Sequence, residues 1–171
     1  MDILCHVGPW CVEQYREIAR NIDFASKVTL VSNFKDIDES GLNLSFDKNF
    51  FLSSQVKTDY VNDREFQDVR FRCRFLRSLT EDRAFSFYSS MKSAVETVFD
   101  TVNPDLVVTE TVDQYLIHLI QIEAKKREIP IFGLVVSFVN DYYRLSAMGG
   151  NEYSRDVSEL EVDAVYKKLT V

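Results

Sequence analysis

The sequence predicts an α/β fold, specifically a Rossmann-like open parallel sheet of about four core strands flanked by helices. Short apolar runs lie at residues 3–7, 27–33, 104–110 and 131–137. In the third run, Leu106-Val107-Val108 is continuous rather than alternating, as in a strand that is covered on both faces of a parallel sheet. Apolar residues at helical spacing separate the runs, which is the pattern of parallel βαβ units.

Length and composition narrow the class of protein. The 171 residues predict a single domain over 1–171, large enough to bury a core without disulfides or metals. The three cysteines lack CxxC spacing, and no apolar run reaches the roughly 18 residues of a membrane span, so we expect a cytoplasmic protein with reduced thiols. A net charge of -7 argues against general binding of nucleic acid.

The first half begins with a strand at 3–7, which Gly8-Pro9 ends, and a helix follows. The strand at 27–33 then completes a right-handed parallel βαβ unit. Apolar residues show no regular spacing over residues 34–62, and a loop of this length without secondary structure is unusual in a compact domain. We therefore expect short irregular strands near residues 42–46 and 51–56.

For the second half of the chain, the sequence predicts four helices, two strands and a polar segment that forms a lip or linker. Residues 64–79 read as one helix with two apolar faces, as if it lay between two layers, and residues 84–102 as a second long helix. The strand at 104–110 leads into a helix at 112–127, and the strand at 131–137 leads into a polar lip or linker at 140–151. A final amphipathic helix is predicted at 157–169.

Polar side chains follow the predicted strands where each one ends. In open α/β sheets the carboxyl ends of the strands face the ligand crevice, so these side chains are expected to share one edge. The candidates for a catalytic role are Glu110, Asp113 and His6. The candidates for substrate binding are Gly8, Ser32, Asn33, Thr109, Ser137, Asn140 and Arg144.

Each catalytic candidate also has a structural interpretation. Glu110 could act as a general base toward a hydroxyl, or it could cap the helix that follows it. Asp113 could be a partner of the same helix dipole. His6 could act as a base or bind a phosphate or hydroxyl, but a hydrogen-bonded structural histidine is an equal alternative.

Several motifs are missing from the chain. Gly8 stands alone at the first strand-to-helix turn, where a dinucleotide or nucleotide site would need GxGxxG or GxxxxGK[ST], so NAD and ATP are disfavoured. The sequence has no HExxH or paired histidines, and we expect no metal and no cofactor. A small hydrolase that uses Glu110 or Asp113 lacks the support of a GxSxG nucleophile elbow.

One basic cluster stands out in this acidic chain. Arg70, Arg74 and Arg77 share a face of the helix predicted at 64–79, and could contact an anionic ligand, an anionic membrane surface or a second domain. The alternative is a solvated face on which the arginines pair with neighbouring carboxylates, namely Glu65, Asp68, Glu81 and Asp82.

Two segments and the order of the elements resemble a known family. The segments are Asn-Pro-Asp-Leu-Val-Val-Thr-Glu at residues 103–110 and Lys-Arg-Glu-Ile-Pro-Ile-Phe-Gly-Leu at residues 126–134. With the strand-turn-helix start and the long arginine-bearing helix, residues 3–145 resemble the N-terminal Rossmann-like half of GT-B-type glycosyltransferases. Within that family, the bacterial group that builds surface or capsular polysaccharides is the nearest match.

The resemblance implies the acceptor-side domain of a transferase in polysaccharide biosynthesis. In that family the N-terminal half mainly holds the saccharide acceptor, the C-terminal half holds the nucleotide sugar, and a carboxylate or histidine at the N-terminal strand ends acts as base. By position, that role falls on Glu110, Asp113 or His6. The nucleotide sugar would need a C-terminal domain or a partner chain, without which we expect no transferase activity.

Two questions stay open at the level of the sequence. The competing class is a noncatalytic Rossmann-like or flavodoxin-like module that binds a ligand or another protein. The chain stops two residues after the helix predicted at 157–169. A natural end and the N-terminal half of a longer protein both fit this position.

Overall fold

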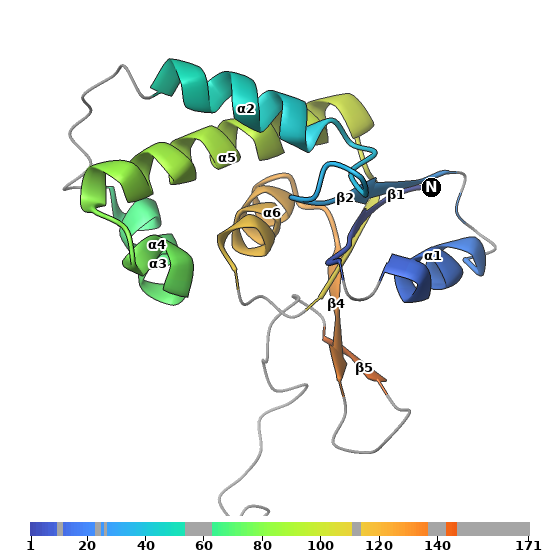
Figure 1. Ribbon diagram of the computed structural model, residues 1–171. Coiled ribbons are helices and arrows are strands. Elements are labelled where there is room, and N and C mark those ends of the chain that lie inside the picture. The colour runs from blue at the N-terminus through green and yellow to red at the C-terminus, as the bar shows by residue number, and fades with distance from the viewer. Residues whose placement is uncertain are drawn as a thin grey trace, which may run out of the picture.

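A five-stranded sheet forms the centre of the molecule (Figure 1). The computed structural model describes residues 1–9, 12–22, 25, 27–53, 63–110, 114–136 and 143–146. The strand order is β2-β1-β3-β4-β5, from strands β1 (Asp2–His6), β2 (Lys27–Val31), β3 (Leu106–Thr109), β4 (Ile131–Val136) and β5 (Tyr143–Ser146). The first four strands of this order pair in parallel, so the predicted Rossmann-like α/β fold is confirmed.

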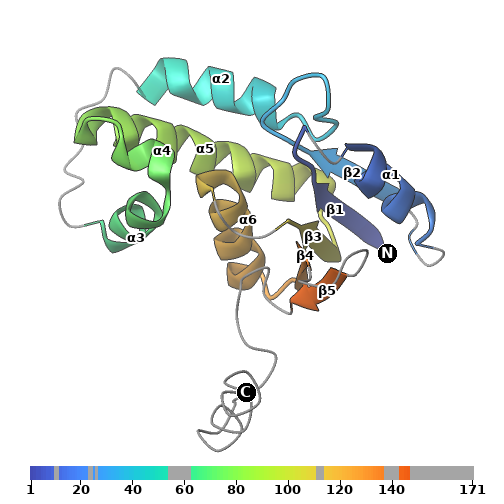
Figure 2. The same cartoon turned by 60° about the horizontal axis from the view of Figure 1, so that its bottom comes forward.

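Helices cover the two faces of the sheet unequally (Figures 1 and 2). Helix α1 (Val12–Arg20) packs on one face, where Tyr15 belongs to the same hydrophobic core as Ile3 and Cys5 of β1. Helices α5 (Glu81–Val102) and α6 (Tyr115–Lys126) cover the other face, to which β1 contributes Leu4. Successive residues of β1 therefore enter two different cores, as expected for a central strand that is buried on both sides.

The direction of the crossovers explains this arrangement. The chain moves from β1 to β2 in one direction across the sheet, and from β2 past β1 to β3 and then β4 in the other direction. Because right-handed crossovers that run in opposite directions place their helices on opposite faces, α1 lies on the face opposite to α5 and α6. The point at which the direction reverses lies between β1 and β3, the two middle parallel strands.

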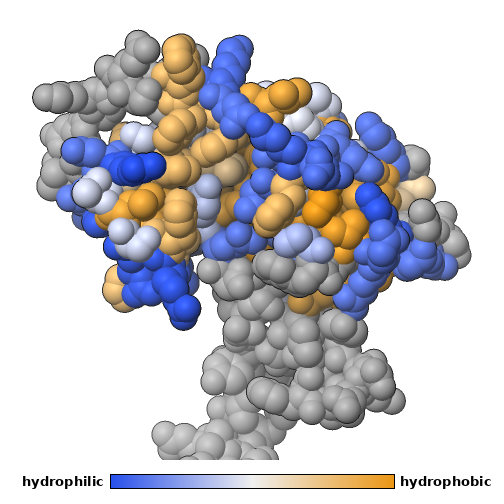
Figure 3. Space-filling view, in the orientation of Figure 1, coloured by the Kyte–Doolittle hydropathy of each residue, from blue (hydrophilic) through white to orange (hydrophobic). Residues whose placement is uncertain are grey.

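Helix α2 (Leu42–Ser53) replaces the strands predicted at 42–46 and 51–56, so that prediction was wrong for the residues that the structure describes. The helix has a well-formed start, because Asp38 Oδ2 accepts the N–H of Asn43 (3.2 Å) and Ser40 Oγ accepts that of Leu42 (3.3 Å). Helix α2 lies along α5, and its Phe46 ring stacks on Phe87 at 6.0 Å. Figure 3 shows a hydrophobic band that crosses this region.

The helix predicted at 64–79 is broken into α3 (Arg64–Arg72) and α4 (Arg74–Arg77). Cys73 between them has an extended backbone, with φ -93° and ψ 114°. Its side chain is buried, whereas the Phe71 side chain is 74% exposed. The segment is therefore a corner with one buried face, and the prediction of a helix buried on two faces was wrong.

Other boundaries differ less from those expected. Helix α5 starts three residues before its predicted limit and ends at Asn103, whose left-handed backbone (φ 47°) precedes Pro104. Strand β5 falls inside the predicted lip and pairs antiparallel to β4. The helix predicted at 157–169 lies outside the described residues. Within the part of the chain that the structure describes, no helix has the length and apolar character needed to cross a membrane.

Candidate functional site

The candidate site lies at the carboxyl ends of β1 and β3, where the direction of the chain across the sheet reverses. Crevices at such points bind the ligands of open α/β folds. The two strands pair through Cys5 and Val108, so His6 and Thr109 stand one residue further toward this edge. Gly8 follows His6 by two residues and Glu110 follows Thr109 directly, and the structure thus brings together four of the residues that the sequence predicted.

One hydrogen bond joins the two strand ends. The backbone N–H of Gly8 donates to Glu110 Oε1 at 2.8 Å, across 102 residues of sequence. Glu110 is half-buried. A helix-cap interpretation of Glu110 did not anticipate this contact, which fixes the carboxylate against the turn that follows β1.

His6 is enclosed beneath this edge. Its side chain is 0% exposed, on the sheet face that α5 and α6 cover. Burial lowers the pKa of His6 to about 4, while the negative charge of Glu110 acts in the opposite sense. Neither ring nitrogen has a hydrogen-bond partner among the described residues. His6 is therefore neutral at pH 7, and its burial withholds it from any ligand at this edge in this conformation.

The hydroxyl groups at the edge divide into two kinds. Ser32 Oγ donates to the backbone oxygen of Val7 at 2.8 Å and accepts the N–H of Phe34, so it ties the end of β2 to the end of β1. Thr109 Oγ1 is buried without a partner in the described part of the chain. Asn33 is exposed on the loop after β2. Of the predicted substrate-binding side chains here, Asn33 alone faces solvent.

The remaining predicted site residues cannot be placed at the edge by their side chains. Asp113, Ser137 and Asn140 lie outside the described residues, and Arg144 is described only through its backbone, which pairs with Val135 in the sheet. Their proposed roles stay predictions. Across residues 1–9, 12–22, 25, 27–53, 63–110, 114–136 and 143–146, no three His, Cys, Asp or Glu side chains cluster as metal ligands do.

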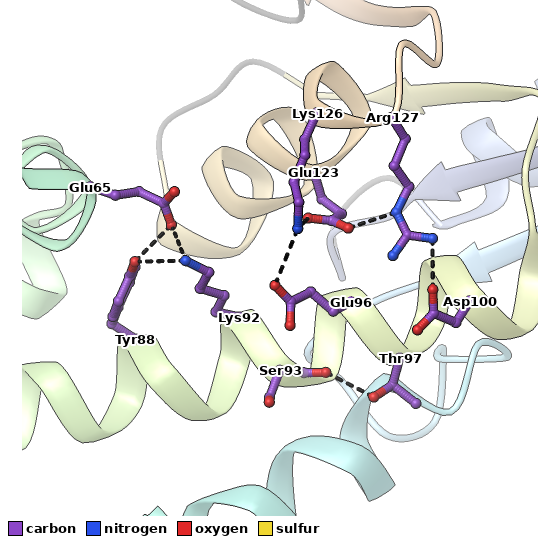
Figure 4. A network of polar contacts seen from close by, with 10 residues as sticks. All are labelled: Glu65, Tyr88, Lys92, Ser93, Glu96, Thr97, Asp100, Glu123, Lys126 and Arg127. Carbon is purple, nitrogen blue, oxygen red and sulfur yellow. Dashed lines mark hydrogen bonds and ion pairs between the residues drawn. The ribbon is translucent and has the colours of Figure 1, made fainter. Parts of the chain in front are cut away.

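A second polar region, at the seam of α5 and α6, was missed by the sequence analysis (Figure 4). Glu123 is almost wholly buried there, with Arg127 Nε 2.6 Å and Lys126 Nζ 3.3 Å from its carboxylate oxygens. Arg127 also reaches Asp100 of α5 at 2.8 Å. The i,i+4 spacing of Glu123 and Arg127 on the helix predicted at 112–127 is the sequence signal that could have indicated this ion pair.

The seam continues to α3 through Glu65. Tyr88 donates its hydroxyl proton to Glu65 Oε1 at 2.7 Å, and Lys92 Nζ lies 2.8 Å from the same atom. Burial works to raise the pKa of Glu65, but the hydrogen bonds from Lys92 and Tyr88, together with the charges of Lys92 and Lys126, lower that pKa overall. Burial and the Glu65 contact raise the pKa of Tyr88. Because these contacts satisfy one another, the seam is structural.

The basic cluster does not form the single helix face that was predicted. Arg70 pairs with Glu81 at 3.2 Å, and Arg72 pairs with Asp68 at 3.0 Å, as the interpretation of a solvated face expects. The break at Cys73 separates Arg70 from Arg74 and Arg77, which have no ion-pair partner in the described parts of the chain.

Comparison of the chain with known protein families, curated proteins and solved structures finds no match in any of the three. The fold and the edge of the sheet define the class, an α/β domain with a Rossmann-like parallel sheet and a crevice position between β1 and β3.

Proposed function

We propose that the protein binds a saccharide acceptor at the edge between β1 and β3, as the acceptor-side domain of a glycosyltransferase in bacterial capsular or surface polysaccharide biosynthesis. The observation that supports this proposal most is the position of Glu110. A half-buried carboxylate stands at the reversal point of the sheet and is oriented by the N–H of Gly8. A carboxylate is a charged hydrogen-bond acceptor, and such groups form strong hydrogen bonds with sugar hydroxyl groups.

In the proposed reaction, Glu110 accepts a hydrogen bond from the acceptor hydroxyl and takes its proton as that oxygen bonds to the anomeric carbon of the donor sugar. The bond from this carbon to the nucleotide breaks, and the nucleotide leaves with the electron pair. Asp113 is the second candidate for the base. The buried position of His6 suits a residue that supports the edge better than one that exchanges protons with a ligand. The nucleotide sugar comes from a C-terminal domain or a partner chain, so the chain alone is inactive as a transferase.

The second candidate is a noncatalytic ligand-binding or protein-interaction module with the same sheet. The enclosure of His6 and the engagement of Glu110 by Gly8 favour it, because neither needs a chemical step. For either function we propose a cytoplasmic location, since Cys73 is a buried thiol that forms no disulfide among the described residues, as expected under reducing conditions.

Calorimetric titration tests the proposal. The purified chain is titrated with neutral and anionic oligosaccharides, nucleotide sugars, free nucleotides and flavin mononucleotide. The Glu110→Gln variant keeps an oxygen that can accept the Gly8 N–H but loses the charge. Glu128→Gln makes the same change on the exposed loop before β4, away from this edge.

If the proposal is right, saccharides bind to the chain and nucleotides give no detectable binding heat. Glu110→Gln should weaken saccharide binding by about tenfold, the value of roughly 1.4 kcal/mol for a charged hydrogen bond, and Glu128→Gln should not. If a nucleotide or flavin binds tightly and saccharides do not bind, the acceptor assignment is overturned in favour of the binding module.

A further inference from the structure

The corner between α3 and α4 presents aromatic and basic side chains together to solvent. We define the basic corner as Phe71, Arg72, Arg74, Phe75 and Arg77. All five are exposed, Phe71 by 74% and Phe75 by 45%. In Figure 3 the surface over α3 and α4 accordingly combines hydrophobic and strongly hydrophilic areas. Exposed phenylalanines among arginines are characteristic of surfaces that lie in the interface of a membrane.

The fold holds the basic corner in one orientation. Cys73 and Leu76 are buried in the main core and alternate with the exposed residues, so the corner cannot turn its aromatic rings inward. Phe75 also rests edge-on against Phe87, with ring centres 5.2 Å apart. Its ring is therefore supported from beneath while its outer part meets solvent.

The charges of the basic corner are available to an external partner. Neither Arg74 nor Arg77 has a carboxylate partner among the described residues, and the Arg72–Asp68 pair is exposed and weak. Residues 64–77 carry five arginines against two carboxylates, in a chain whose net charge is -7. One of those carboxylates, Glu65, is already held by Lys92 and Tyr88. The local charge is thus opposite in sign to that of the whole protein.

From these observations we infer that the basic corner docks on the surface of an anionic phospholipid bilayer. Phe71 and Phe75 insert at the boundary between headgroups and acyl chains, and Arg74 and Arg77 contact the lipid phosphates. A protein partner fits less well, because two phenylalanines bury about 300–500 Å² together, well below the roughly 800 Å² per partner of a stable interface. A bilayer needs no pocket to receive a convex corner.

Vesicle sedimentation of the full chain tests the inference. The vesicles contain phosphatidylcholine alone or phosphatidylcholine mixed with phosphatidylglycerol, at low and at physiological salt. One variant, Arg74→Gln with Arg77→Gln, removes the unpaired charges, and its control Arg16→Gln removes an arginine charge from α1. The other variant, Phe71→Ala, removes an exposed ring, and its control Phe34→Ala removes one from the loop after β2.

We expect binding to the anionic vesicles only, and weaker binding as salt rises. The double arginine variant should lower the partition coefficient about 25-fold, at about fivefold per arginine, and Phe71→Ala should lower it about tenfold. The two controls should bind as the unchanged chain does. Equal binding to both vesicles, no binding to either, or equal losses in the controls would overturn the inference.

A spectroscopic variant separates insertion from simple charge attraction. The chain contains one tryptophan, so the emission of Phe71→Trp after subtraction of the unchanged chain reports the environment of position 71. Insertion shifts this emission to the blue on anionic vesicles. An unshifted emission would reassign the corner to a soluble polyanion. The same reassignment would follow if the chain bound single-stranded RNA or polyglutamate but no vesicles, and if Phe71→Ala left that binding intact.

Discussion

The seam between α5 and α6 and the edge between β1 and β3 both bury ionisable side chains, but only the seam neutralises them with partners. At the seam, the buried Glu123 lies against two cationic side chains. At the edge, the buried His6 has no hydrogen-bond partner in the described residues, and the nearby Thr109 hydroxyl has none either.

The difference separates stabilising contacts from costly ones. A buried charge with partners holds two helices together, whereas a buried polar atom without a partner costs roughly 1–3 kcal/mol. In a native fold each such atom calls for an explanation, such as a catalytic role or a bound water. The His6 and Thr109 atoms lie beside Glu110, and other buried atoms without a partner in the described residues belong to Thr29, Arg70 and His118. The comparison therefore marks the edge as one place where buried polar atoms lack partners, in contrast to the charge network in Figure 4.

The largest expected effect tests whether His6 is neutral. Its folded pKa of about 4 lies below the ordinary value of 6.5, so the unfolded chain takes up the proton first as the pH falls. Stability is therefore complete above pH 6.5 and is lost as the pH falls toward 4. His6→Leu should remove about 3 kcal/mol of this loss, measured by urea unfolding at pH 7 and pH 4.

A titration of the unchanged protein checks the same point without a mutation. The imidazole carbon-bound protons of His6, followed by NMR, should keep the chemical shifts of the neutral ring down to about pH 4. A midpoint near 6.5 would show that the ring is solvated and would remove the contrast between the two regions.

The next effect concerns the seam and uses two matched i,i+4 pairs. Glu123 and Arg127 form a pair whose carboxylate side chain is 5% exposed, while Asp68 and Arg72 form one whose carboxylate is 50% exposed. Arg127→Met should cost about 2 kcal/mol, less than the roughly 3–5 kcal/mol of a wholly buried pair because Lys126 remains. Arg72→Met should cost no more than about 0.5 kcal/mol. Urea unfolding measures both, and equal losses would mean that burial does not distinguish the pairs.

The smallest effect compares two buried hydroxyl groups at the edge. Ser32→Ala removes the hydrogen bond to the Val7 oxygen and should destabilise the fold by about 1 kcal/mol. Thr109→Val removes a hydroxyl that has no partner in the described structure, and should be neutral or stabilising by up to about 1 kcal/mol. Thermal unfolding resolves the sign of each change. A loss at Thr109 as large as that at Ser32 would identify a partner for its hydroxyl.

The sequence predicted the parallel strands well because each is a short apolar run between clear boundaries. It failed at α2, where Phe, Leu and Asn give no helical period and the start signal lies in Asp38 and Ser40, ahead of the helix. It failed again at Cys73, because a single extended residue in the middle of a helical pattern leaves no trace in the spacing of apolar residues.

The grouping of the candidate residues at one edge was predictable from the sequence, but their contacts were not. Placing Glu110, Gly8 and His6 at one edge needed only the rule that carboxyl ends of parallel strands converge. The hydrogen bond from Gly8 to Glu110 Oε1 depends on the register of β1 against β3. The burial of His6 depends on the packing of α5 and α6 on the sheet. Those are properties of packing, and local sequence does not encode them.

The central position of β1 affects the order in which its two strand pairings can form during synthesis. Its partner β2 follows soon in the chain, but the contact of Asp2 with Asp105 beside β3 spans 103 residues. At about 5–20 residues per second, translation leaves one side of β1 without its strand partner for roughly 5–20 seconds. During that interval the nascent chain exposes an open strand edge. The pairing of β1 with β3 in the middle of the finished sheet thus forms later on the ribosome than the pairing of β1 with β2, and the pairings of β4 and β5 follow it.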